Sequence, residues 1–156
     1  MVRGSWPGWW LGLLVGTASP LVAQGTQPSS RAELKENYPN PFFPATTIPF
    51  VLSAELCERS RRPMVSLKVY NVLVQAVAIP VLVVGPPGGS AGSSPATGER
   101  LDSLRLGCGS HRAYWDGTNL NGTREPTPGI YYYQLTVDGE RFTRKMIAQK
   151  RVTSRH

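Results

Sequence analysis

The chain has 156 residues and a formal net charge of +7. This is about the length of one domain, which excludes a large multidomain enzyme. Gly and Pro are abundant, at 16 and 14 residues, and 40% of the residues are hydrophobic. Such a composition favours turn-rich β structure over long helices and excludes a wholly disordered chain.

Residues 1–25 have the pattern of a secretory signal peptide, with the positive Arg3 before an apolar run from Trp9 to Val15 and small residues at the end. A membrane anchor is the alternative, but it needs about 20 apolar residues. Gly16 and Pro20 interrupt the run before that length. The sequence therefore predicts export to the periplasm, cell surface or medium, with no transmembrane span after cleavage.

Residues 26–37 are polar and are predicted to form a linker. Ser30 and Glu33 fit a capping box, which allows one helical turn before the prolines that follow. The alternation of apolar residues at Ile48 and Phe50 then predicts a first strand over residues 46–52. Pro49, which has no N–H to donate, suggests that this strand lies at a sheet edge.

Three further segments follow in order. Residues 64–71 alternate cleanly and predict a half-buried antiparallel strand. Residues 76–84 are apolar on both faces, and Pro80 indicates an edge position or a bulge in a third strand. Residues 85–100 are rich in Gly, Pro and Ser and are predicted to form a flexible loop.

The C-terminal third carries the strongest strand pattern. A fourth strand is predicted near residues 109–115, followed by turns to residue 128. Residues 129–138 place Tyr131 and Tyr133 on one face with two aliphatic residues, and Asp138-Gly139 predicts a type I′ turn into residues 141–149. These two strands should form a hairpin.

Together the patterns predict an all-β fold, an immunoglobulin-like antiparallel β-sandwich of about six to seven strands over residues 38–150. Residues 151–156 are predicted to be a disordered tail. Alternating strand directions place Cys57 and Cys108 at the same end of the sandwich, and an oxidising compartment makes them candidates for one disulfide.

Signs of chemistry are few. His111 and His156 are the two histidines, and Cys108 with His111 has the spacing of only half a zinc site. Residues 116–122 resemble a calcium loop, but Gly117 and Pro128 stand at ligand positions. We therefore predict no catalytic residues, no metal and no cofactor. The basic charge suits an anionic envelope surface or polymer, while nucleic acid is disfavoured by export and by the lack of a base-reading motif.

Four motifs occur in a fixed order: NYPNPFFPATTIPF at 37–50, VSLKVYNVLVQAV at 65–77, HRAYWDG with a following NG at 111–122, and GIYYYQLTVDGERFTRKMIAQK at 129–150. Together they resemble the C-terminal sorting domain of type IX secretion cargo, which is similar to the immunoglobulin-like domain of the flagellar hook-capping protein. Val74 departs from the family pattern, which usually has Gly in the turn after the second strand.

The resemblance implies a non-catalytic sorting module that an outer-membrane secretion translocon recognises, with anionic surface polysaccharide as a further partner. The family's recognition positions correspond to three segments of this chain, which we call the lead-in (residues 37–42), the central turn (115–122) and the sorting end (129–147). These positions are Asn37, Tyr38, Pro39, Asn40, Pro41, Phe42, Trp115, Asp116, Gly117, Asn121, Gly122, Gly129, Tyr131, Tyr133, Lys145, Met146 and Ile147.

Two other functions remain open from the sequence. The chain is alternatively a free-standing structural or binding module of the cell envelope, which uses basic residues or exposed Tyr70, Tyr114 and Tyr132 for contact. A third reading is a secreted enzyme whose catalytic part is absent from this chain. Fold-level similarity alone does not choose among them.

Overall fold

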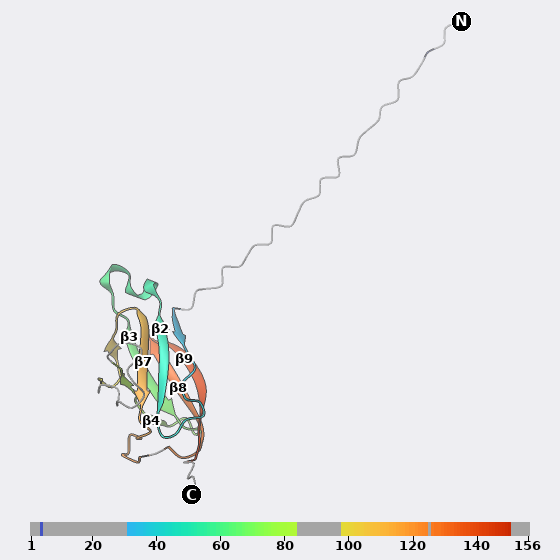
Figure 1. Cartoon of the computed structure of the whole chain (residues 1–156). Coiled ribbons are helices and arrows are strands. Elements are labelled where there is room, and N and C mark those ends of the chain that lie inside the picture. Colours follow the sequence, from blue (N-terminus) through green and yellow to red (C-terminus); the bar gives the residue numbers. More distant parts are fainter. Residues whose placement is uncertain (1–3, 5–30, 84–97, 125, 151–156) are drawn as a thin grey trace.

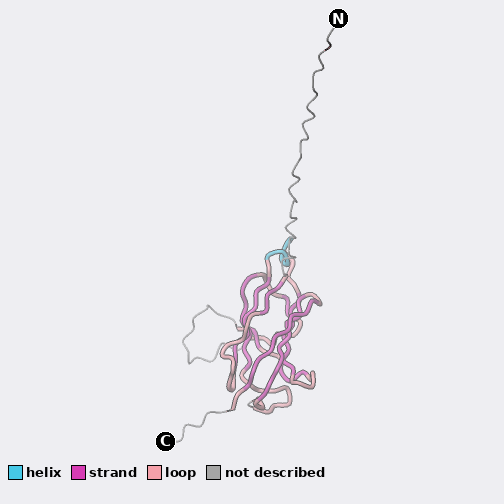
Figure 2. Tube along the Cα trace, turned by 90° about the vertical axis from the view of Figure 1, so that its right-hand side faces the viewer, coloured by secondary structure: helices cyan, strands magenta, loops and turns pink. Residues whose placement is uncertain are grey.

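The computed structural model describes residues 4, 31–83, 98–124 and 126–150. The predicted signal peptide and tail, and the greater part of the predicted loop at 85–100, therefore lie outside the described residues. The described chain is an all-β sandwich of two antiparallel sheets (Figures 1 and 2).

The first sheet has the strand order β1-β2-β7-β5 and the second has the order β4-β3-β8-β9, with β6 also paired to β3. The bounds in the first sheet are β1 Ala32–Leu34, β2 Thr46–Leu52, β5 Val81–Leu82 and β7 Gly109–Trp115. Those in the second are β3 Met64–Tyr70, β4 Ala76–Ala78, β6 Leu104–Arg105, β8 Gly129–Val137 and β9 Glu140–Ala148. One 3-10 helix, η1, spans Ala54–Ser60.

Alternating side chains from both sheets fill the space between them. The predicted inward positions on β2, β3 and β8 are buried, as the sequence pattern indicates. The largest fully buried side chains include Tyr133, Phe50, Ile48 and Leu67. Each apolar side chain of this kind contributes about 1.5–3 kcal/mol by leaving water, so the two inner faces hold the sandwich together.

The predicted linker is partly wrong, because Ala32–Leu34 forms β1. Ala32 and Leu34 are buried and pair in register with Leu52 and Phe50. A two-residue alternation around Glu33 suits a strand, and the capping-box reading of one helical turn is therefore wrong. The described residues contain nine strands where about six to seven were predicted, since β1 and the short β6 lie in segments that lack a long alternating pattern.

The edge position predicted for Pro49 is also wrong, because β2 lies between β1 and β7. The Pro49 carbonyl accepts from Lys35 N at 3.0 Å, just beyond the end of β1. A residue's N and C=O point to the same side of a strand, so the missing N–H faces the side where β1 has already ended. Farther on, Pro80 separates β4 from β5, and the single strand predicted there is two short strands in different sheets.

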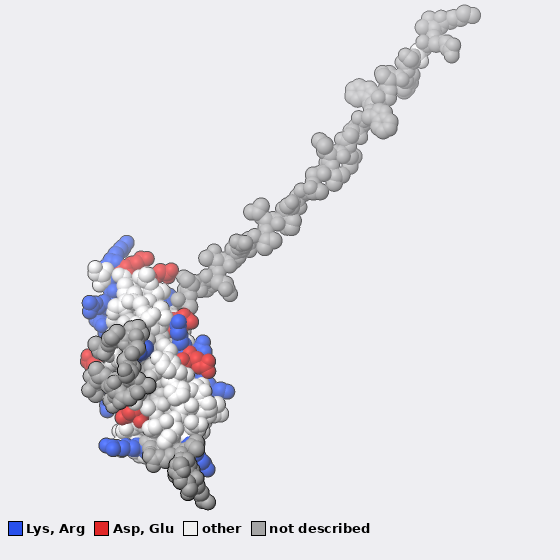
Figure 3. Space-filling model, in the orientation of Figure 1, with Lys and Arg blue, Asp and Glu red and all other residues white. Residues whose placement is uncertain are grey.

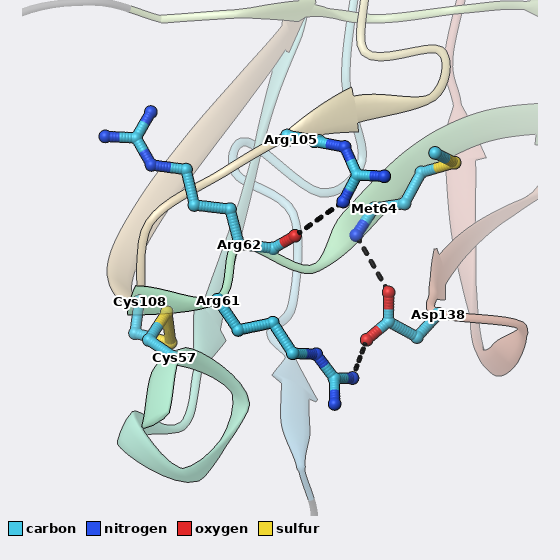
Figure 4. Close-up of polar contacts among 7 residues, drawn as sticks. All are labelled: Cys57, Arg61, Arg62, Met64, Arg105, Cys108 and Asp138. Carbon is cyan, nitrogen blue, oxygen red and sulfur yellow. Dashed lines mark hydrogen bonds and ion pairs between the residues drawn. A yellow bond between two sulfur atoms is a disulfide. The ribbon is translucent and has the colours of Figure 1, made fainter. Parts of the chain in front are cut away.

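The predicted type I′ turn between β8 and β9 is confirmed. Asp138 and Gly139 both have positive φ, at 48° and 91°. The Asp138 carboxylate accepts from Met64 N at 2.9 Å and pairs with Arg61, as Figure 4 shows. The turn is thereby tied to the start of β3.

These contacts predict an acid-sensitive component of stability. The bond from Met64 N, followed by the hydrogen bond from Arg61, lowers the pKa of Asp138 from its usual 3.8. A lowered folded-state pKa contributes stability that is present above the usual value and is lost as pH falls below it. In urea unfolding between pH 7 and pH 2, Asp138→Asn should show a weaker acid loss than the native chain, while its Asn-Gly turn remains favourable. An identical acid loss in both proteins would contradict this role of Asp138.

Candidate functional site at the C-terminal pole

The lead-in from Asn37 to Phe42 lies along the free edge of β9. Phe42 N donates to the Ile147 carbonyl at 2.9 Å, and Gln149 N donates to the Phe42 carbonyl at 3.0 Å. Ile147 N donates to Asn40 Oδ1 at 3.1 Å, across 107 residues of sequence. The lead-in therefore forms hydrogen bonds with the edge of β9, while the outer face of β9 stays exposed.

Phe42 anchors the lead-in in an aromatic cluster. Its ring is fully buried, with centroids 5.4 Å from Trp115 and 6.5 Å from Tyr131. Trp115 and Tyr131 are themselves 5.8 Å apart in an edge-to-face arrangement. The structure thus brings together one member of each of the three predicted groups: lead-in, central turn and sorting end.

The Tyr133 hydroxyl fixes the start of the lead-in by two hydrogen bonds to the backbone at Lys35 and Asn37. Its hydroxyl donates to the Lys35 carbonyl at 2.8 Å and accepts from Asn37 N at 3.1 Å. Burial raises the pKa of this phenol, so it stays protonated and able to donate at neutral pH. Asn37 is buried as well and donates from Nδ2 to Thr46 Oγ1 at 3.0 Å. These positions fix the path of the chain.

The central turn has the backbone role that its residues indicate. Asp116 Oδ1 accepts from Thr118 N at 2.8 Å, and Asn121 Oδ1 accepts from Thr123 N at 3.0 Å, as Asp and Asn do in turns. Gly117 has φ +89°, and a Cβ there would lie 2.5 Å from the Pro44 carbonyl oxygen. Only glycine fits this position without displacing Pro44, just beyond the lead-in.

An open pocket of about 720 Å³ lies beside this turn, lined by Pro44, Asp116, Thr118, Gly122 and Arg124. Thr118 N and Oγ1 already occupy the two Asp116 carboxylate oxygens. Over residues 31–83, 98–124 and 126–150, no group of three or more His, Cys, Asp or Glu is placed to hold a metal ion. The geometry of the turn supports a structural role.

Exposed apolar side chains concentrate at the end of the sandwich formed by residues 37–45, 70–75, 116–132 and 145–150, which we call the C-terminal pole. Of the nine exposed large hydrophobic residues in the described chain, Met64 alone lies at the opposite end, beside the β8–β9 turn. The other eight are Tyr38, Val72, Leu73, Val74, Leu120, Ile130, Tyr132 and Ile147.

The predicted site residues therefore separate into two kinds. Seven are buried and hold the pole together: Asn37, Phe42, Trp115, Gly117, Tyr131, Tyr133 and Met146. Outside these are Tyr38, Pro39, Asn40, Pro41, Asp116, Asn121, Gly122, Gly129, Lys145 and Ile147. The sequence prediction missed Val72 to Val74, Leu120 and Ile130. Three successive apolar residues between two strands, where turns are usually polar, were the available signal.

The two cysteines lie at the opposite pole. Cys57 in η1 and Cys108 before β7 form a disulfide, with Cα atoms 5.9 Å apart (Figure 4). Nearby, Arg105 donates to the Arg62 carbonyl at 3.2 Å. Because both sulfurs are bonded to each other, Cys108 does not supply a zinc ligand beside His111.

In the view of Figure 3, Lys and Arg side chains project at several points around the margin of the described domain, Asp and Glu side chains lie among them, and an uncharged surface lies between. Within the described chain, no helix is both long and apolar enough to cross a membrane. Comparisons with protein-family models, with curated proteins and with solved structures find no match.

Proposed function

We propose that this chain is a non-catalytic targeting module of immunoglobulin-like type, exported and then recognised by an outer-membrane translocon through a type IX-like route. The observation that carries the proposal is the joining of the lead-in to the last strand. Asn40 and Phe42 bond to Ile147 and Gln149 although they are more than 100 residues apart in sequence. Recognition of this combined edge would require the domain to be folded.

The outer face of the joined edge offers a specific set of contacts. Lys145 and Ile147 are exposed on β9, and Ile147 pairs with the exposed Ile130 of β8. Met146 and Ala148 are buried and so unavailable for such contact, and truncating β9 would remove these core residues as well.

 Point variants that leave Met146 and Ala148 in place are the sharper test.

The experiment places a reporter protein between residues 25 and 26 and follows its location in bacteria with and without a working type IX translocon. The native domain should carry the reporter to the cell surface or medium only where the translocon works. The double variant Lys145→Ser/Ile147→Ser should leave the reporter in the periplasm, because it removes two side chains of the proposed recognition surface. Both side chains are exposed, so their loss should cost little folding stability.

The matched control is Arg62→Ser/Met64→Ser at the opposite pole. It also removes one basic and one apolar exposed side chain, since Met64 is 42% exposed and Ile147 is 40% exposed. Export of the control with retention of the test variant supports recognition at the C-terminal pole. Periplasmic reporter in both strains for the native domain would overturn the proposal and favour a free-standing module of the envelope.

A further inference from the structure

The turn between β3 and β4 presents three successive apolar side chains to solvent. Val72 is 63% exposed, Leu73 is 72% exposed and Val74 is 79% exposed. We call these three residues the apolar tip. Single exposed apolar residues are common on protein surfaces, but a contiguous projecting group marks an interaction site.

The apolar tip is held in one conformation by Asn71. Asn71 Oδ1 accepts from Leu73 N and from Gln75 N, both at 3.0 Å, and its Nδ2 donates to Gln75 Oε1 at 2.9 Å. The backbone adds a bond from Val74 N to the Asn71 carbonyl, also at 3.0 Å. The apolar side chains therefore project from an ordered turn.

Val74 occupies this turn at an energetic cost. Its φ is +60°, in the left-handed region that β-branched residues rarely adopt. Gly or Asn would adopt the same backbone more easily. Neither burial nor backbone geometry favours Val at this position, and a strained residue of this kind points to a function for its exposed side chain.

Aromatic and basic side chains border the apolar tip. Tyr70, Tyr132 and Lys145 stand opposite one another across β3, β8 and β9, so they share the outer face of the second sheet. An open groove of about 450 Å³ joins the apolar tip to this face, and its lining includes Val74, Tyr132 and Arg141. Tyr side chains combine an apolar ring with a polar hydroxyl, which suits a boundary between apolar and aqueous surroundings.

The charged side chains at the outward positions of these three strands are all basic. The outward positions of β3, β8 and β9 between residues 66 and 147 include Lys68, Arg141 and Lys145 and no acidic residue. Lys68 is 3.6 Å from Asp102, whereas no ion pair is formed by Arg141 or Lys145 within the described chain. The face is thus complementary to an anionic surface.

We propose that the apolar tip inserts into the interface of an anionic lipid bilayer, with Tyr70 and Tyr132 at headgroup level and Arg141 and Lys145 over the anionic headgroups. A projecting apolar group, an aromatic border and neighbouring cations are the three features that favour binding to such an interface. A lipid surface accommodates a convex tip without a matching pocket. This binding needs no translocon and is independent of the function proposed above.

The test uses the chain from residue 26, which keeps every described strand and the disulfide and lacks the apolar segment near the N-terminus that would itself bind lipid. Binding is measured by co-sedimentation with vesicles of phosphatidylcholine and phosphatidylglycerol and with vesicles of phosphatidylcholine alone. Native protein should bind the anionic vesicles more tightly, and added salt should weaken that binding.

Variants separate the two contributions. Leu73→Ser should weaken binding to anionic vesicles by about tenfold or more, because it removes the largest apolar side chain of the tip. Arg141→Ser/Lys145→Ser should remove most of the dependence on phosphatidylglycerol. Met64→Ser, which truncates an exposed apolar side chain at the other pole, should bind as the native protein does.

Val74→Asn provides a readout of folding that is separate from binding. It should unfold at a higher urea concentration than the native protein, because Asn tolerates the left-handed backbone, and it should bind vesicles less tightly. For Leu73→Trp, the emission of the new indole should shift to shorter wavelength when anionic vesicles are added.

Three results would overturn the proposal. The first is a native protein that does not bind anionic vesicles, and the second is a Leu73→Ser variant that binds them as tightly as native protein does. The third is a native protein that self-associates in solution through the apolar tip, detected by sedimentation as a dimer that Leu73→Ser abolishes. That result would identify a second copy of the chain as the occupant.

Discussion

Phe42→Ala should lower the free energy of unfolding by about 3–5 kcal/mol, the usual cost of truncating a fully buried aromatic side chain. Phe42 is 0% exposed and packs against Trp115 and Tyr131. The truncation would leave a cavity between the lead-in and the two sheets. The backbone hydrogen bonds of Phe42 to β9 and Gln149 limit how far the lead-in can move to fill it. Urea unfolding at neutral pH, followed by tryptophan fluorescence, measures the change.

Tyr38→Ala is the matched control because it truncates an aromatic residue of the same lead-in that is 50% exposed. Exposed positions usually change stability by no more than about 0.5 kcal/mol, so this variant should unfold close to the native midpoint. Equal midpoints for Phe42→Ala and the native protein would show that the lead-in is not anchored by its aromatic ring.

The strands that could be predicted from the sequence are those in which apolar and polar residues alternate over more positions than chance would produce. β3 and β8 each place apolar residues at every second position, and both are half buried as that pattern requires. The type I′ turn was predictable because Asp-Gly adopts positive φ at both positions at low cost. Local chemistry decided these elements.

Other elements were missed where tertiary context decides. β1 has only three residues, with Glu33 between two buried residues. So short an alternation cannot be distinguished by sequence from the polar segment around it. Pro49 predicts an edge strand because proline has no N–H to donate. An internal strand can nevertheless contain proline at a position where the neighbouring strand has ended. Both errors arise from the pairing of strands that are separate in sequence.

The candidate site shows the same division. The resemblance named Phe42 and Ile147 as members of one family pattern, but their hydrogen-bonded contact depends on the closure of the whole sandwich. The apolar tip is the sequence Val72-Leu73-Val74, for which the sequence alone predicts only a short turn between two strands. Its exposure becomes evident only when Asn71 is seen to fold the turn away from the core.

The features proposed for recognition and those that stabilise the fold lie at opposite poles. The C-terminal pole carries the exposed apolar groups and the joined edge, while the opposite pole carries the disulfide and the contacts of Asp138. Stability and recognition are therefore open to separate experiments. A change at the disulfide should alter unfolding without altering the surface proposed to contact a partner.

Replacing both cysteines, as Cys57→Ser/Cys108→Ser, should lower the free energy of unfolding by about 4 kcal/mol. The disulfide joins residues 51 apart in sequence, and its removal restores the corresponding loop entropy to the unfolded chain. Half-buried cysteines leave small gaps when changed to serine, so the entropic effect should dominate. Urea unfolding of native and double-variant protein, with and without reductant, gives the difference.

Reductant should lower the unfolding midpoint of the native protein to that of the double variant and leave the variant unchanged. Below its midpoint, the variant should still bind anionic vesicles as the native protein does, because the apolar tip and its basic neighbours lie at the other pole. Equal midpoints for native and variant protein would mean that the closed loop remains constrained without the bond. Lost vesicle binding in a folded variant would mean that the two poles are coupled through the sheets.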